Sequence, residues 1–209
     1  MTRIFGSAGI IAGALRAVSP FVSARLSAEW LELLYVIIDL GLILGLTGLY
    51  LVHMTRLNRI GGGAFIVALC GLALIAGPDA PLFGVSAYLI GTPIIGIGVA
   101  TFSVALLTAG LGSRLGSVLL VVAFILGAVA TVLPQITALA MLSGIVFGLG
   151  FIANGVHVFR YAGEPTSATT GMHWVRPGRA LGITIVAADP PTRRNSHLNR
   201  GLLHARSKT

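Results

Sequence analysis

Charged side chains are scarce in this sequence. Six acidic and fourteen basic residues make up 10% of the 209 residues, whereas 56% are hydrophobic and the mean hydropathy is +0.95. A soluble domain of this size carries roughly a quarter charged residues, which keep its surface in water. The composition therefore excludes an ordinary soluble protein and predicts that most of the outer surface contacts lipid.

The familiar signatures of catalysis are also missing. The sequence has no phosphate-binding GxxxxGK[ST] loop, no GxGxxG, no GxSxG and no HExxH pattern. Only three aspartates occur, too few for the divalent-metal chemistry of lipid synthases, and no lipidation signature is present. The sequence therefore favours a protein without enzymatic activity and without a bound cofactor.

Long apolar runs are what the sequence does contain. A membrane-spanning helix needs about 20 mostly apolar residues, and these runs are apolar on every side rather than alternating. They predict an all-α, multi-pass transmembrane helix bundle. The five expected spans are residues 31–53, 62–77, 85–110, 115–133 and 137–161.

The N-terminal segment, residues 1–30, is ambiguous. Its apolar run at 4–15 is short and glycine-rich, and it ends at Arg16. We expect an amphipathic helix that lies in the membrane interface, with a signal-like segment and a further crossing as the alternatives. A further crossing would make six spans and place both termini on one side of the membrane.

Arginines mark one side of the predicted bundle, residues 31–161. The connections at 55–61 and 110–116 are basic, whereas those at 77–84 and 134–135 contain no base. Because basic loops face the cytoplasm, we expect these two loops and the C-terminus to be cytoplasmic and the N-terminus to be outside. Topology and anionic lipid headgroups explain the net charge of +8 without nucleic acid as a partner.

The C-terminal tail, residues 162–209, has a different composition. It holds seven bases and four prolines among many small polar residues, and we expect it to be largely disordered and to contact anionic headgroups. Thirteen of the fourteen bases in the chain are arginine, which is typical of a GC-rich genome. The expected location is a bacterial inner or plasma membrane.

The first expected span, 31–53, carries a polar stripe. At 100° per residue, five polar side chains fall within an arc of about 60°: Glu32, Tyr35, Asp39, Tyr50 and His53. An ionised carboxylate inside a bilayer costs on the order of 2.5–3.5 kcal/mol, so Asp39 must be protonated, paired or in contact with water. Asp39, with Tyr35 and Tyr50, is the candidate site for a proton or cation. A structural hydrogen bond is the alternative.

The opposite side of the same span carries Gly41, Gly45 and Gly48. Small residues in this spacing allow another backbone to approach closely, so this side is expected to pack against a helix.

Two further features could bear on function. His157 of the last span and His53 are expected at the same membrane face, where two histidines could bind a metal or haem, although headgroup-level histidines are common. Pro93 is expected to bend or start the third span, with Thr92, Gly96 and Ser103 along one face.

Three functions follow from these features. The first is a non-enzymatic structural or accessory subunit that assembles with itself or with another membrane subunit. The second is a small oligomeric transporter or channel in which Asp39 binds a proton or cation. The third is haem or metal binding by His53 and His157.

Overall fold

The computed structural model describes residues 2–76, 81, 82 and 84–161, so the expected tail lies outside the described residues. Within them the chain forms six α-helices, all in the compact unit 1–167. The helices are α1 (Thr2–Val22), α2 (Ala28–His53), α3 (Arg59–Ile75), α4 (Ala87–Thr108), α5 (Arg114–Val132) and α6 (Thr137–Tyr161). A 3₁₀ turn, Ser23–Arg25, joins α1 to α2, and a hairpin of β1 (Pro81–Leu82) and β2 (Val85–Ser86) precedes α4.

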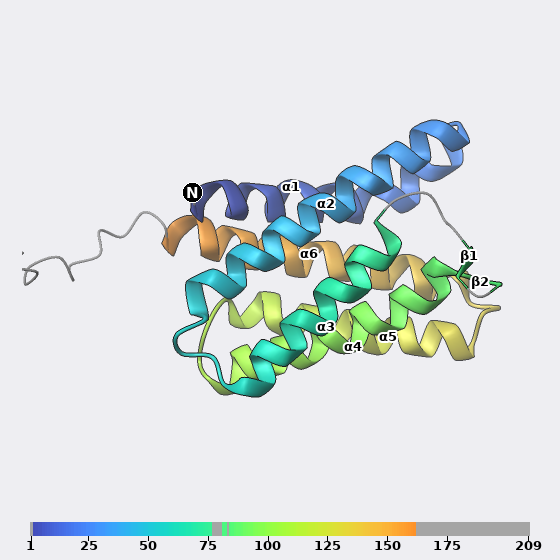
Figure 1. Ribbon diagram of the computed structural model, residues 1–209. Helices are drawn as coiled ribbons and strands as arrows, with labels where there is room; N and C mark the ends of the chain where they lie inside the picture. The colour runs from blue at the N-terminus through green and yellow to red at the C-terminus, as the bar shows by residue number, and fades with distance from the viewer. Residues whose placement is uncertain (1, 77–80, 83, 162–209) are drawn as a thin grey trace, which may run out of the picture. The chain divides into compact units, whose positions relative to one another are not determined.

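Successive helices run in opposite directions (Figure 1), and five of the seven described arginines fall at one end of the bundle. That end contains the start of α1, the α2–α3 and α4–α5 connections, and the end of α6. We call it the basic end, because it carries Arg3, Arg56, Arg59, Arg114 and Arg160. The other end, where α1 joins α2 and α5 joins α6, is called the opposite end.

Helix α1 differs from the interfacial helix expected for residues 1–30. It packs against α6 and α2, and a Cβ built on Gly6 would lie 2.9 Å from the carbonyl oxygen of Gly155. An interfacial helix keeps a charged face in water. The exposed side chains of α1, apart from Arg3 at its start, are instead apolar: Ile4, Ile11, Ala14, Val18 and Phe21.

The start of α1 lies at the same end of the bundle as the end of α6. Arg3 lies over the ring of Phe159, 5.8 Å from its centroid, so α1 begins beside the end of α6. The leading expectation had placed the start of the chain on the other side of the membrane from the end of the last span, 137–161. The structure agrees instead with the alternative of a further crossing, because α1 is long and apolar enough to span a membrane.

Among the described residues, five helices are long and apolar enough to cross a membrane, in agreement with the expected number, but they are not the same five. They are α1, α2, α4, α5 and α6, whereas α3, with 17 residues, is a shorter apolar helix. Large apolar side chains are exposed along all six helices, for example Ile66, Leu89 and Ile125. Such a surface is suited to lipid rather than to water.

Two connections at the basic end are defined by local chemistry. The side chain of Asn58 accepts a hydrogen bond from Gly61 N at 2.8 Å and caps α3. Helix α4 ends in a Schellman motif, in which Leu111 N donates to Leu106 O at 2.8 Å. This motif needs a left-handed residue, and Gly110 supplies it with φ of 67°.

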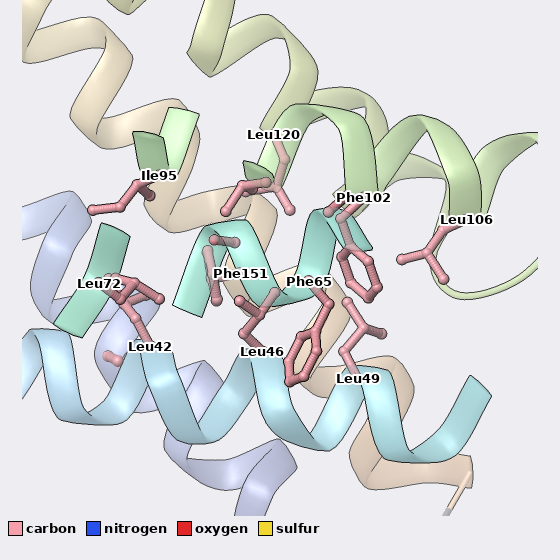
Figure 2. Close-up of a cluster of buried hydrophobic side chains, with 14 of the residues drawn as sticks. Leu42, Leu46, Leu49, Phe65, Leu72, Ile95, Phe102, Leu106, Leu120 and Phe151 are labelled. Carbon is pink, nitrogen blue, oxygen red and sulfur yellow. The ribbon is translucent and has the colours of Figure 1, made fainter. Parts of the chain in front are cut away.

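The buried core lies between α2 on one side and α3 to α6 on the other (Figure 2). Leu42, Leu46 and Leu49 project from successive turns of α2 toward this core. The labelled side chains that meet them come from α3 (Phe65, Leu72), α4 (Ile95, Phe102, Leu106), α5 (Leu120) and α6 (Phe151).

Candidate functional site

A cavity of about 540 Å³ lies in the half of the bundle toward the opposite end. All six helices contribute to its wall, and most of the lining side chains are apolar. Its volume falls within the range of ligand sites in proteins, roughly 300–1,000 Å³. The cavity is therefore large enough for a small organic molecule.

Three polar side chains of α2 follow one another into this cavity. Glu32 is exposed, Tyr35 is half-buried and Asp39 is 8% exposed, and all three line the cavity. Their spacing of three and four residues puts them on one face of the helix. The result is a polar track from the outer turn of α2 to a carboxylate at depth.

Arg16 of α1 faces this track from the neighbouring helix. Its guanidinium lies over the ring of Tyr35, 5.8 Å from the centroid, which is within cation–π range. Arg16 also lines the cavity together with Asp39. The segment that was expected in the interface thus brings a basic side chain into the same cavity as the buried acid.

The wall facing α2 is formed largely by α4 and α5. Thr92, Pro93 and Gly96 of α4 line it, and Thr92 Oγ1 donates to Tyr88 O at 2.7 Å. A threonine hydroxyl bound to its own helix offers little further polarity to a ligand. Ser103, which was expected on the same face of this helix, is buried in the core and lines neither this cavity nor the smaller one described below.

Tyr50 shares the helical arc of Asp39 but not its surroundings. It stacks on Phe65 of α3, with ring centroids 4.1 Å apart and planes at 3°. It lies eleven residues from Asp39, which is roughly 16 Å along an α-helix. The structure therefore brings Asp39 and Tyr35 together in the cavity and leaves Tyr50 packed against the core.

The glycine side of α2 meets α1. A Cβ built on Gly45 would lie 2.6 Å from the Cα of Gly9, and one on Gly41 would lie 2.6 Å from the Cβ of Ala12. A Cβ on Gly48 would collide with Phe5. These glycines therefore serve contacts within the chain.

His53 and His157 lie side by side at the basic end, with ring centroids 5.5 Å apart and planes at 28°. Tyr161 contacts both rings, with centroids 6.0 Å from His53 and 6.3 Å from His157. Across the described helices and connections, no group of three or more His, Cys, Asp or Glu side chains has an arrangement that could hold a metal ion. Neither histidine lines the large cavity.

Sequence reasoning missed Arg16 as a site residue, although a signal for it was present. Gly6, Gly9 and Gly13 precede it at spacings of three and four, the pattern of a closely packed membrane helix. Read as a span, the segment would have carried Arg16 as an intramembrane charge, which is a functional candidate by default.

Comparison of the chain with protein-family models, with curated proteins and with solved structures finds no match.

Proposed function

We propose that this chain is a multi-pass membrane protein that binds a small, largely apolar organic cation in the cavity and carries it across the membrane. The observation that supports the proposal most directly is the buried carboxylate of Asp39 in an otherwise mainly apolar cavity of about 540 Å³. A carboxylate held in such surroundings is stabilised by a cation of matching size.

The charges of the cavity favour a cation over an anion. Two acids, Glu32 and Asp39, line it against one base, Arg16. When all three are ionised, the cavity carries one excess negative charge. The guanidinium of Arg16 is already directed onto the ring of Tyr35.

Aromatic rings in the wall favour an organic cation over a bare metal ion. Tyr35, Tyr88, Phe124 and Phe147 line the cavity. The faces of such rings attract ammonium and phosphonium groups and also contact their apolar substituents. A hydrated metal ion would gain little from these walls.

The arginine distribution supports an orientation for the protein. With α1 inside the bundle, five arginines lie at the basic end, and this end should face the cytoplasm. The cavity lies in the other half of the bundle, so the bound cation would enter from outside. The start of α1 and the end of α6 both lie at the basic end and are then cytoplasmic.

An accessory-subunit function has less support from the geometry. Its main argument was a glycine side on α2 available to another chain, and α1 covers that side at Gly41 and Gly45. Haem or metal binding has only the pair of His53 and His157, without a third ligand among the residues that the structure describes.

The test is equilibrium binding of tetraphenylphosphonium to the purified protein in nanodiscs. We expect saturable binding to the wild type and at least about tenfold weaker binding to Asp39→Asn, which corresponds to roughly 1.4 kcal/mol. Glu29→Gln is the matched control, because Glu29 is an exposed acid on α2 that does not line the cavity. Absence of saturable binding to the wild type, or equal affinities of Asp39→Asn and Glu29→Gln, would refute the proposal.

A further inference from the structure

A second, much smaller cavity of about 10 Å³ lies on the basic-end side of the large one. Four helices line both cavities. On α1, α2 and α6 the residues of the small cavity lie nearer the basic end, and on α5 the same residue, Leu120, lines both. Gly9 replaces Arg16 on α1, for example, and Asn154 lies beyond Phe147 on α6. The two cavities therefore follow one another along the bundle.

The partition between them is apolar and one side chain thick at α5. Leu120, which is 1% exposed, lines both cavities. On α2 the lining passes from Leu42 to Leu46, one turn further on, and on α6 it passes from Phe147 to Phe151, whose ring centroids are 5.0 Å apart. Figure 2 shows Leu42, Leu46, Leu120 and Phe151 in the same cluster.

A buried polar side chain lies directly beyond the partition. Asn154 is 3% exposed and lines the small cavity. Its Nδ2 donates to Gly150 O at 3.1 Å, whereas its Oδ1 has no hydrogen-bond partner. Buried polar atoms of this kind are normally satisfied by water or an ion, and a space of about 10 Å³ is close to the minimum for one water molecule.

Two further buried polar side chains in the basic-end half, one near Asn154 and one at the end of α2, have atoms without a hydrogen-bond partner. Ser117 of α5 is fully buried, and its Oγ has no partner. It follows Gly116, where a built Cβ would lie 2.6 Å from Nδ2 of Asn154. His53, at the end of α2, is 4% exposed and its Nε2 also has no partner.

We propose that Leu120, flanked by Leu46 and Phe151, is a gate between the cation cavity and a polar path along Asn154, Ser117 and His53 to the basic end. The structure holds this gate closed, with the cavity on one side and a space for a single water on the other. Withdrawal of Leu120 joins the two cavities and gives water and small cations a route from the large cavity toward the basic end. This inference rests on the proposed transport function, since it describes the second half of the same route.

The test measures access of a cationic thiol reagent to position 117. Cys70, the one native cysteine and exposed, is first replaced by alanine, and Ser117→Cys is added in proteoliposomes. Trimethylammonium-ethyl methanethiosulfonate is supplied at the opposite end. We expect slow labelling with Leu120 intact and at least tenfold faster labelling with Leu120→Ala.

The matched control is Leu106→Ala. Leu106 is a core leucine that is as buried as Leu120 but lines neither cavity. We expect it to leave the labelling rate unchanged, and size-exclusion profiles verify that all variants remain folded. Equal acceleration by both leucine variants, or an unreactive thiol in the Leu120→Ala background, would overturn the gate.

The reagent needs no bound ligand, so this result is separable from the binding proposal. Saturating tetraphenylphosphonium should slow the labelling in Leu120→Ala if the cation occupies the large cavity, through which the reagent must pass to reach the gate. Gate-dependent labelling that tetraphenylphosphonium does not slow would refute the cation site and leave the gate standing. Binding that depends on Asp39, together with gate-independent labelling, would refute the gate alone.

Discussion

Helices α5 and α6 contact each other in two different ways along their length. Near the basic end, a Cβ built on Gly116 would lie 2.9 Å from the carbonyl oxygen of Gly150. Near the opposite end, a Cβ on Gly127 would meet only Ser143 Oγ at 3.1 Å, and one on Gly144 only Arg16 Nε at 3.9 Å. Glycine therefore brings two backbones together at one end and leaves room beside a cavity at the other.

This difference bears on how glycine-rich membrane helices are interpreted. Close contacts between glycines contribute packing energy, because without side chains the two backbones come near enough for van der Waals contact. Glycines beside a cavity contribute volume instead, and both Gly127 and Gly144 line the large cavity. The same residue type thus supports stability in one region and binding in another.

The largest expected effect is a difference in stability between leucine substitutions at the two glycines of α5, Gly116 and Gly127. Gly116→Leu should prevent α5 from reaching α6, because the new atoms would meet the backbone of Gly150, which cannot rotate away. We expect a loss of at least about 1–3 kcal/mol of stability. Gly127→Leu should keep the wild-type thermal unfolding temperature to within a few degrees, as measured in detergent. Equal destabilisation of the two variants would remove the distinction between the two regions.

Binding should respond in the opposite order. Gly127→Leu places four carbons in the cavity and should weaken tetraphenylphosphonium binding by about tenfold, roughly 1.4 kcal/mol. Gly63→Leu is the control, because nothing lies within 4 Å of a Cβ at Gly63 and this residue is outside the cavity. Isothermal titration calorimetry in nanodiscs measures both. Unchanged binding by Gly127→Leu would place the ligand elsewhere.

Removing the base from the cavity should strengthen cation binding. Arg16→Gln takes away a positive charge that lies in the cavity with Asp39, so tetraphenylphosphonium should bind about fivefold more tightly, roughly 1 kcal/mol. Arg25→Gln, at an exposed arginine outside the cavity, should change the affinity little. Weaker binding by Arg16→Gln would show that the guanidinium supports the site through Tyr35 rather than opposing the cation.

The smallest expected effect concerns hydrogen bonds in the cavity half. Ser143 Oγ donates to Ala123 O at 2.9 Å and thereby links α6 to α5. Ser143→Ala should cost about 1 kcal/mol and lower the unfolding temperature by roughly 2–4 °C. Thr131→Val is the comparison, because the Thr131 hydroxyl bonds only within its own exposed turn of α5. Identical unfolding curves for the two variants would mean that this link contributes no stability.

The positions of most helices could be predicted because an apolar run of the right length allows few other structures in a membrane. The expected span 137–161 and helix α6, Thr137–Tyr161, have the same bounds, and the other four expected spans agree with their helices to within three residues at each end. Residues 2–22 were the exception. The glycines and Arg16 lower the mean hydropathy of this segment. The contacts with α6 that hold it in the bundle are tertiary, so the local sequence does not reveal them.

The cavity could not be predicted from periodicity. Helical phase places Tyr50 and Asp39 on one face, but depth along the axis separates them. Which helix faces that stripe depends on the order of all six helices around the core. Asp39 could be singled out because of its cost inside a bilayer. Thr92, Pro93 and Gly96 were noted from the sequence, but their position opposite Asp39, and the companions on α1 and α5, became visible only in the structure.

The proposed function requires that the cavity beside Asp39 holds an organic cation. Its most direct test is an electron cryo-microscopy structure of the protein in nanodiscs with tetraphenylphosphonium, solved with a rigid antibody fragment bound at the basic end. We expect density for the cation inside the cavity, in contact with Tyr35 and near the carboxylate of Asp39. Density for a lipid chain in the cavity, with the cation only on the outer surface, would contradict it.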